Sequence, residues 1–500
     1  MPILDRPLVA AVSLAYLALM TAIGLWALRR TRTARDFFVA GQSIGLLVTG
    51  LATMSAAFSG FVFLGGPGLV YQMGLASLLI VAPVGFTAGL LCWTVAKRLR
   101  LLSETRPVYT VPDALLARYR SRLVSGLAAV GILLGSVAYL GAQLQALGVL
   151  IEAVFGTREL LGAWSLPAAM GAGVAAIAVY AVAGGMVAGV YTDFVQGLTM
   201  VGAALGVFYY ALEAGGGLGT MTREIAASPA FGPGFLDPLG GAPLFTAAGF
   251  FFLFGVGVLG QPQMLHKFYM LRDVSRLRWM PAVLGGSQAA CILIWLGIGL
   301  AVPALVAAGR LEPLASPDDA SPVFLLQFAP GLLAGVVVAG VLAAIMSSAD
   351  SFVNIASAAL VRDLPKALGV RLPEQLLWGR VMVLAIAVLA ALFALVYGDL
   401  IALLGTFAFA TFAAALAPAM AVGLNWKRVG AGAAGASIAT GLLLQVGLEL
   451  ATRAGRLTVL PPGVLPGVVA LAGSFTVLIL WAWVAPGPAP DDDVALVMEL

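Results

Sequence analysis

Long apolar runs recur along the whole chain and constrain its fold more than any other feature. A helix needs about 20 apolar residues to cross a bilayer, and hydrocarbon offers no partners to unpaired backbone groups. The runs lack the alternating pattern of membrane-barrel strands. We therefore predict an all-α polytopic membrane protein with about 13 transmembrane helices. The runs cover residues 8–28, 42–70, 74–96, 123–153, 161–185, 190–212, 243–265, 279–307, 324–360, 378–396, 398–423, 429–451 and 464–485.

Composition supports a membrane protein and argues against an enzyme. Charged residues make up 10% of the 500 residues and mean hydropathy is +1.03, whereas a soluble domain has about 25% charged residues. Cys92 and Cys291 both lie in apolar runs, so we expect buried thiols and no disulfide. The sequence has one histidine, His266, and no catalytic triad, metal cluster or phosphate loop. We expect no enzymatic activity, no organic cofactor and no nucleic-acid partner.

Basic residues are distributed unevenly among the loops. If the N-terminus lies outside, the alternate loops that face the cytoplasm carry 21 of the 27 basic residues. The positive-inside rule then predicts the N-terminus out, the C-terminus in and an odd number of spans. The cytoplasmic set is Arg29, Arg30, Arg32, Arg35, Lys97, Arg98, Arg100, Arg106, Arg118, Arg120, Arg122, Lys267, Arg272, Arg276, Arg278, Arg362, Lys366, Arg371, Arg380, Lys427 and Arg428. The acidic, proline-rich residues 486–500 are predicted to be a short disordered cytoplasmic tail.

Glycine and proline interrupt two runs that lie five spans apart. The second run contains Ser59-Gly60, and the seventh contains Gly260-Gln261-Pro262. Each interruption alone is compatible with simple helix packing, since both residue types are common in membrane helices. Paired interruptions at corresponding positions of two halves, however, indicate the binding site of a transporter.

These interruptions suggest how one transmembrane domain, residues 1–485, is organised. We predict a first repeat over about 42–212 and an inverted second repeat over about 243–423. An extra N-terminal helix at 8–28 and two peripheral helices within 429–485 would flank the repeats.

The ninth run carries a stripe of polar side chains. Ser347, Asp350, Ser351, Asn354 and Ser357 fall within about 120° on a helix. Polar groups in hydrocarbon are costly, a carboxylate most of all, and mark a functional site by default. Hydroxyl, carbonyl and carboxylate oxygens are the ligands of a hard cation such as Na⁺.

Four stretches, in a fixed order along nearly the whole chain, resemble one known family. They are Asp-Phe-Phe-Val-Ala-Gly-Gln-Ser at 36–43, Phe-Leu-Gly-Gly-Pro-Gly-Leu-Val-Tyr at 63–71, Tyr-Thr-Asp-Phe-Val-Gln at 191–196, and Met-Ser-Ser-Ala-Asp-Ser at 346–351 followed by Arg-Asp-Leu at 362–364. The chain thus resembles the sodium/solute symporter family, which includes bacterial proline and sugar symporters. The resemblance implies a five-plus-five inverted-repeat (LeuT-type) fold.

The resemblance also implies a sodium site between the second and ninth spans. Its ligands would be the backbone carbonyls of Ser55, Phe58 and Ala344 and the hydroxyls of Ser347 and Ser348.

Two aspartates extend this implied ion path. The family has an aspartate at Asp193 that is thought to help Na⁺ leave; the alternative is a carboxylate stabilised at a helix N-terminus. Asp350 is either a further ligand, an attractor in the inner cavity, or a carboxylate at the cytoplasmic boundary paired with Arg362 or a similar basic residue.

The solute would lie at the midplane beside Na⁺. Candidate lining residues are Tyr139, Gln143, Phe61, Phe254 and Gln261, together with Phe58; each phenylalanine is also compatible with plain core packing. Proline symporters have a tyrosine at the place of Tyr139. The chain departs from them at four positions, which argues against proline as the solute. They are Ala57 for an aspartate, Phe61 and Phe254 for tryptophans, and Val258 for a tyrosine.

We therefore predict Na⁺-coupled symport of a small organic solute, such as an amino acid or monocarboxylate, into the cell by alternating access. The expected setting is the bacterial inner membrane, where the protein would contact the lipid bilayer and work as a monomer. Two alternatives remain open: proton coupling through Asp350 or Asp193, and a transporter-like sensor that acts with a separate kinase.

Overall fold

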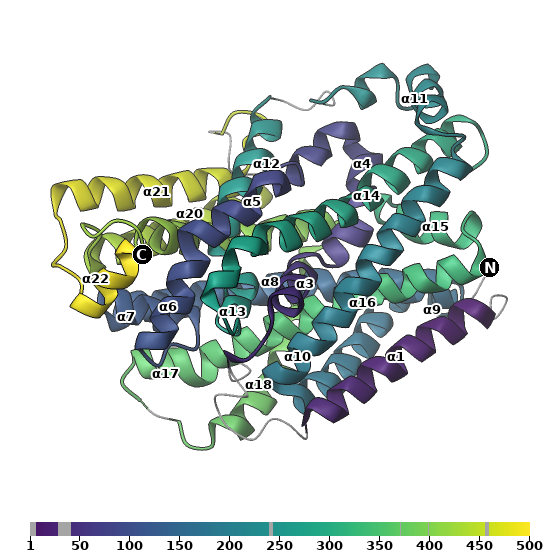
Figure 1. The fold of residues 1–500 in the computed structure, drawn as a ribbon. Coiled ribbons are helices and arrows are strands. Elements are labelled where there is room, and N and C mark those ends of the chain that lie inside the picture. The colour runs from purple at the N-terminus through teal and green to yellow at the C-terminus, as the bar shows by residue number, and fades with distance from the viewer. Residues whose placement is uncertain (1–6, 29–41, 240–243, 371, 399, 456–459) are drawn as a thin grey trace.

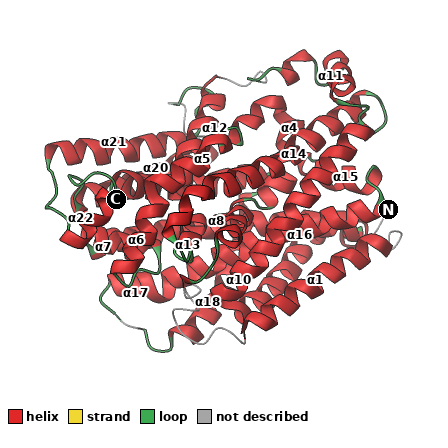
Figure 2. Cartoon of the chain, viewed as in Figure 1, coloured by secondary structure: helices red, strands yellow, loops and turns green. Residues whose placement is uncertain are grey.

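The computed structural model describes residues 7–28, 42–239, 244–370, 372–398, 400–455 and 460–500. Within these ranges the regular elements are helices (Figure 2), and an isolated bridge joins Ile44 to Leu271. The all-α prediction is confirmed for the described residues. Most of the motif at 36–43 and the basic residues Arg29, Arg30, Arg32, Arg35 and Arg371 lie outside them.

The first half of the chain runs through the helices coloured purple to teal in Figure 1. They are α1 (Pro7–Leu28), α3 (Leu46–Ala57), π-helical η3 (Phe61–Gly65), α4 (Gly66–Met73), η4 (Gly74–Ile80), α5 (Val84–Leu91), η5 (Cys92–Ala96), α6 (Lys97–Thr105), α7 (Val111–Tyr119), α8 (Arg122–Phe155), α9 (Thr157–Leu161), η6 (Gly162–Trp164), α10 (Ser165–Ala214), α11 (Leu218–Ala227) and η7 (Pro233–Leu236).

The second half follows in teal, green and yellow. It comprises α12 (Leu244–Gly257), η8 (Val258–Gly260), α13 (Pro262–Phe268), η9 (Val274–Trp279), α14 (Met280–Ala307), η10 (Pro317–Asp319), α15 (Ala320–Gln327), α16 (Gly331–Ala358), η11 (Ala359–Asp363), α17 (Leu364–Ala367), α18 (Gln375–Tyr397), α19 (Ile401–Ala417), η12 (Pro418–Val422), α20 (Ala431–Arg453), α21 (Pro466–Val484) and α22 (Asp492–Glu499).

The helices are long and apolar enough for a multi-pass membrane protein. Among the described residues, nine can cross a bilayer by length and composition, or ten when α12 and α13 count as one span bent by 43°. Two shorter apolar helices, Pro7–Ile23 and Leu46–Ala57, lie in predicted runs one and two. The predicted number of thirteen is therefore not confirmed.

One helix covers two predicted spans. The sequence predicts a short break between runs 161–185 and 190–212, whereas α10 is helical from Ser165 to Ala214. Residues 186–189, which lie between the runs, contain no proline, and only proline would strongly disfavour a helix there. The structure describes Gly189–Ala214 as the spanning part.

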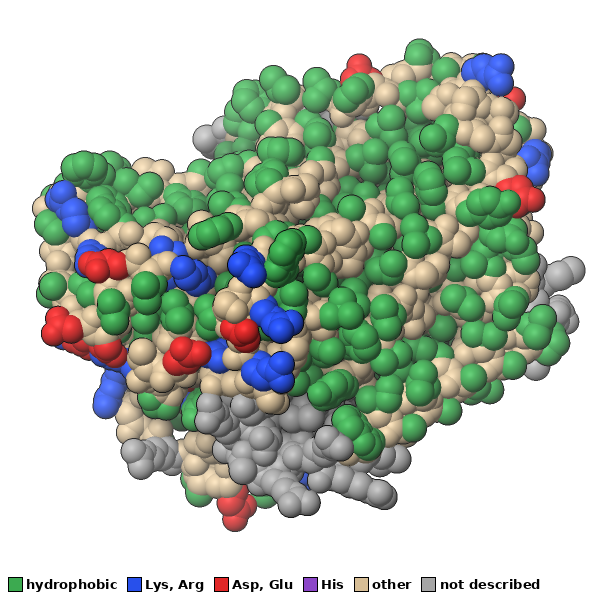
Figure 3. All heavy atoms as spheres, in the orientation of Figure 1, with side chains coloured by type: hydrophobic (Ala, Val, Ile, Leu, Met, Phe, Trp, Pro, Cys, Tyr) green, Lys and Arg blue, Asp and Glu red, His purple; other side chains and the backbone are tan. Residues whose placement is uncertain are grey.

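On the face seen in Figure 3, charged side chains gather in two regions. Apolar side chains cover most of this face, and the charged ones lie in its left half, from the left edge to near the middle, and at the upper right. Helices α6, α7 and α22 lie on the left side of the same view and α11 at the upper right (Figure 1). In α18, Leu384, Leu389 and Leu392 are about half exposed, as expected of side chains that face lipid.

Loops that were predicted to share a side of the membrane contact one another. Arg100 Nε donates to the Leu271 carbonyl at 2.5 Å, and Arg362 donates to Asp113 at 2.6 Å. At the other end, Arg310 donates to the Ala214 carbonyl at 2.8 Å. The predicted alternation of loops agrees with these contacts, while the choice of the cytoplasmic end stays a prediction.

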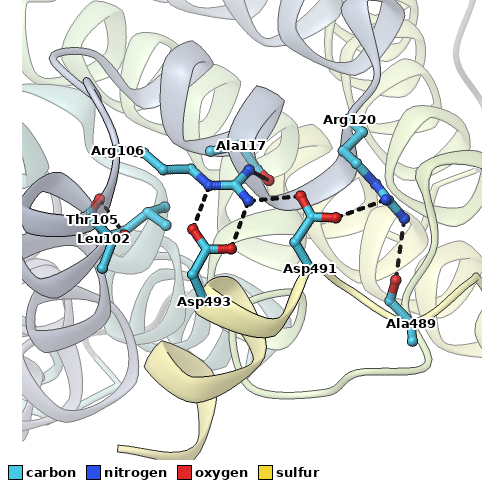
Figure 4. Close-up of polar contacts among 8 residues, drawn as sticks. All are labelled: Leu102, Thr105, Arg106, Ala117, Arg120, Ala489, Asp491 and Asp493. Atoms are coloured by element: carbon cyan, nitrogen blue, oxygen red, sulfur yellow. Dashed lines mark hydrogen bonds and ion pairs between the residues drawn. The ribbon is translucent and has the colours of Figure 1, made fainter.

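The C-terminal tail is ordered, contrary to the prediction of disorder. Helix α22 lies against α6 and α7, and Arg106 binds both Asp491 and Asp493 through its guanidinium (Figure 4). The distances are 2.7 Å to Asp491 and 2.6 Å to Asp493, and Arg120 also reaches Asp491 at 2.7 Å. Lys427 forms a further ion pair with Glu499. The acidic composition that predicted disorder instead supplies partners for basic loops.

Docking of this tail should depend on pH. The hydrogen bond from Arg106 holds the pKa of Asp493 below its usual value. Because its pKa is lowered in the folded state, ionised Asp493 stabilises the docked tail at pH values above its unfolded-state pKa of about 3.9. This stabilisation is lost as the pH falls through the folded-state pKa. We expect limited proteolysis to cut residues 486–500 faster below about pH 4, and faster in 1 M salt at neutral pH. Asp493→Asn should accelerate cleavage at neutral pH, whereas Asp492→Asn, the matched control, should not.

Candidate cation and solute site

The second predicted span is broken where the sequence placed Ser59-Gly60. Helix α3 ends at Ala57, and Phe58 leaves helical geometry with φ −100° and ψ 118°. The Phe58 amide donates to the Met54 carbonyl at 2.8 Å, and the next backbone bonds run from Val62 and Phe63 to the Ser59 carbonyl. The carbonyls of Ser55 and Phe58 therefore lie between the last backbone hydrogen bond of α3 and the first ones of the helix that follows.

Side chains from α8 hold this break in place. Gln143 Oε1 accepts a hydrogen bond from the Gly60 amide at 3.0 Å, and the Tyr139 hydroxyl lies 3.2 Å from Ser59 Oγ. A Cβ at Gly60 would lie 2.6 Å from the Ala146 Cβ, so only glycine fits against α8 here. Two predicted solute residues thus contact the break directly.

Two of the serines predicted to bind Na⁺, Ser55 and Ser347, meet between α3 and α16. Ser55 Oγ donates to Ser347 Oγ at 2.7 Å, although they are 292 residues apart. Ala344 lies fully buried one turn earlier on α16. The Ser348 hydroxyl is buried with no hydrogen-bond partner recorded in the described part of the chain. A buried hydroxyl without a partner is costly, so a bound cation would suit this position.

Asp193 joins this cluster through both carboxylate oxygens. Ser347 Oγ donates to Asp193 Oδ1 at 2.6 Å, and Lys267 Nζ donates to Oδ2 at 2.5 Å. The Asp193 and Lys267 side chains are 1% and 2% exposed, so the ion pair is shielded from water. Four helices, α3, α10, α13 and α16, are connected by this one chain of hydrogen bonds.

The structure decides between some of the alternatives for the two aspartates. Asp193 lies well inside α10, so the helix N-terminus interpretation is wrong. Arg362, one suggested partner of Asp350, forms an ion pair with Asp113 in the structure. Asp350 Oδ1 instead accepts from Asn354 Nδ2 at 2.9 Å.

The remaining solute candidates form an aromatic row beside the second break. Phe61 stacks on Phe254 with centroids 5.9 Å apart, and Phe254 stacks on Phe409 at 4.4 Å. Gln261 Nε2 donates to the Gly257 and Phe409 carbonyls, both at 3.1 Å. Gln261, at the bend between η8 and α13, thereby links this bend to α19.

Sequence reasoning missed Lys267. It was assigned to a cytoplasmic loop because it follows an apolar run, but α13 extends to Phe268 and buries it. A signal was present: Lys267 lies five residues after Pro262, within one short helix of the second interruption. A lysine so close to a membrane break can turn inward.

The oxygen-rich cluster can coordinate a monovalent cation. Hydroxyls of Ser347 and Ser348 and carbonyls at the α3 break resemble a shell of neutral oxygens that replaces hydration water. Within the described ranges, no group of three or more His, Cys, Asp or Glu residues is placed to hold a metal ion.

Comparison with known proteins supports a transporter. The model of the sodium:solute symporter family matches residues 37–441. The chain is 29% identical to the osmoregulated proline transporter OpuE of Bacillus subtilis over 462 residues, which covers 89% of this chain and 90% of that protein. It is 30% identical to the sodium/proline symporter of Escherichia coli over 439 residues, with 83% and 82% covered.

A solved structure shows the same fold. The substrate-bound, outward-open Na⁺-coupled sialic acid symporter superposes with a TM-score of 0.78 over 96% of this chain and 98% of that one, at 18% identity. This likeness supports the LeuT-type fold that the family resemblance implied.

Proposed function

Because the chain belongs to the sodium:solute symporter family, we propose that it couples Na⁺ entry to uptake of a small organic solute by alternating access. The observation that carries the proposal is the Ser55–Ser347 contact at the α3 break; Ser348, the next residue on α16, has a buried hydroxyl without a hydrogen-bond partner among the described residues. Na⁺ bound by these hydroxyls and by the Ser55, Phe58 and Ala344 carbonyls would join α3 to α16. That link would favour the state that binds solute.

Coupling then follows from reciprocity of binding. If Na⁺ orders the α3 break, it also orders Ser59 and Gly60, which Tyr139 and Gln143 contact. A solute bound at these side chains must in turn increase the affinity for Na⁺ by the same factor. The membrane potential contributes about 2.3 kcal/mol per charge for each 100 mV. Asp193 and Asp350 would guide Na⁺ toward the inner side.

We place the protein in a bacterial inner membrane as a monomer. The solute class is small and organic; an amino acid or a monocarboxylate fits the mixed polar and aromatic candidates Tyr139, Gln143, Phe61, Phe254 and Gln261. Proline is a weaker choice, because Ala57, Phe61, Phe254 and Val258 replace the residues of proline symporters.

Proton coupling is the second candidate function, and the environment of Asp350 favours it. This carboxylate is 7% exposed, and its recorded hydrogen bond in the described residues comes from the Asn354 amide rather than from a cation. Uptake that persists without Na⁺ and collapses with a protonophore would select proton coupling.

A thermal-shift screen tests the proposal. The purified protein is heated with a panel of amino acids and monocarboxylates, in Na⁺ and in K⁺ at equal ionic strength. A solute at 100 times its dissociation constant adds about 2.7 kcal/mol of stability. We expect one solute class to raise the melting temperature in Na⁺ only. Stabilisation that is equal in Na⁺ and K⁺ would contradict sodium coupling.

Removal of the Tyr139 hydroxyl should weaken solute binding more than Na⁺ binding. Tyr139→Phe keeps the ring stacked on Phe352, whose centroid is 4.3 Å away, but loses the contact with Ser59. A hydrogen bond contributes about 1 kcal/mol, so solute affinity should fall roughly fivefold. Solute titrations at saturating Na⁺ measure this effect, and Tyr109→Phe, remote from the break, serves as the control.

A further inference from the structure

The buried ion pair between Lys267 and Asp193 places a fixed positive charge inside the candidate cation site. Lys267 Nζ lies 2.5 Å from Asp193 Oδ2, and Asp193 in turn accepts from the Ser347 hydroxyl. A buried charge without a partner costs several kcal/mol, so a carboxylate that stays ionised in this region needs a compensating cation.

The charges of the cluster can be counted. Asp193 and Asp350 are the two acidic side chains, and Asp350 interacts electrostatically with both Asp193 and Lys267. A Cβ at Gly189, one turn before Asp193, would lie 3.0 Å from Asp350 Oδ2, so the Asp350 carboxylate packs against α10 near Asp193. With both acids ionised and Lys267 protonated, one negative charge is left to be balanced, and a single Na⁺ balances it.

The ion pair also fixes the orientation of Ser347. A hydroxyl has one hydrogen and two lone pairs. The Ser347 hydrogen points to Asp193, and one lone pair accepts from Ser55. The second lone pair remains for a cation. Lys267 donates to the Asp193 carboxylate and fixes its position, and this carboxylate accepts the Ser347 hydrogen. The lone pairs of Ser347 therefore face away from α10.

We propose that Lys267 is a tethered cation that takes the charge-balancing place of a second Na⁺ beside Asp193, and so limits coupling to one Na⁺ per solute. This inference rests on the proposed Na⁺-coupled function. Lys267 acts as a positioning residue, because its contact is with Asp193 and not with the transported ion.

The test counts bound Na⁺ in charge-altered variants. Equilibrium binding of radioactive Na⁺ to the purified full-length protein is measured with choline as the replacing ion. The wild type should bind one Na⁺ per chain. Lys267→Gln leaves two uncompensated carboxylates and should bind two, with a steeper concentration dependence. Lys267→Arg should bind one, because it keeps the charge.

A double variant separates charge from simple structural damage. Asp193→Asn combined with Lys267→Gln restores the wild-type net charge and should bind one Na⁺. If Lys267→Gln does not fold, Asp193→Asn tests the proposal instead. In that variant the charge of Lys267 balances the charge of Asp350, so Na⁺ binding should be lost. A merely structural role would lower the melting temperature of Lys267→Gln without raising the number of ions bound.

The failures of the two proposals are distinguishable. One Na⁺ on both the wild type and Lys267→Gln, or two on the wild type, overturns the tethered-cation inference and leaves Na⁺ coupling intact. Saturable Na⁺ binding absent from the wild type, with and without the solute panel, overturns Na⁺ coupling and this inference together.

Discussion

Replacement of Ser347 and Ser348 by alanine should abolish Na⁺-dependent uptake while the protein still inserts into the membrane. Both hydroxyls would bind the ion, and loss of even an outer-shell partner of a metal costs about 10–100-fold in affinity. We therefore expect Na⁺ affinity to fall by at least about 100-fold. Uptake in membrane vesicles across a range of Na⁺ concentrations measures this affinity. Unchanged Na⁺ affinity in this double variant would refute the site.

Single variants make this prediction sharper. Ser348→Ala removes a buried hydroxyl that has no recorded partner in the described residues, so stability without Na⁺ should not fall. Its Na⁺-induced rise in melting temperature should nevertheless disappear. Ser357→Ala is the matched control on the same helix, because Ser357 donates to the Gly379 carbonyl on α18, away from the cluster.

Gly66→Ala should severely destabilise the protein. A Cβ at Gly66 would lie 1.9 Å from Trp295 Cε2 and 2.0 Å from Nε1, and the Trp295 side chain is fully buried on α14. Overpacking of a tight core costs about 1–3 kcal/mol and occasionally more. We expect a clear fall in melting temperature and reduced membrane expression.

A second helical glycine provides the comparison for Gly66. Gly89 lies on α5 with nothing within 4 Å of its Cβ position. Because alanine favours a helix over glycine by up to about 1 kcal/mol, Gly89→Ala should be neutral or stabilising. Equal melting temperatures for the two variants would show that the space between α4 and α14 can open at little cost.

Membrane character, helical class and family could be predicted from the chain, because they depend on local properties. Hydropathy and length are read residue by residue, and the four family stretches are contiguous. The family model over 37–441 confirms the resemblance. The polar stripe on α16 was also visible, because the period of a helix is fixed, and the structure places Ser347 in contact with Ser55 and Asp193.

Hydropathy was misleading where a charged residue has a distant partner. Lys267 is a loop residue by local composition, yet Asp193, 74 residues earlier, makes its burial possible. Residues 486–500 are a disordered tail by composition, yet Arg106 and Arg120 bind Asp491. In both cases the stabilising ion pair is made with a residue far away in the sequence, which local composition does not reveal.

The sequence by itself determined that this chain is a helical membrane protein of the symporter family, with serine oxygens on the ninth predicted span and a break in the second predicted span. Only the tertiary structure decided that α10 brings Asp193 to Ser347 and that α13 brings Lys267 to Asp193. The reason is physical: helix formation and membrane insertion depend on each segment's own residues, whereas the balance of buried charges depends on which segments meet.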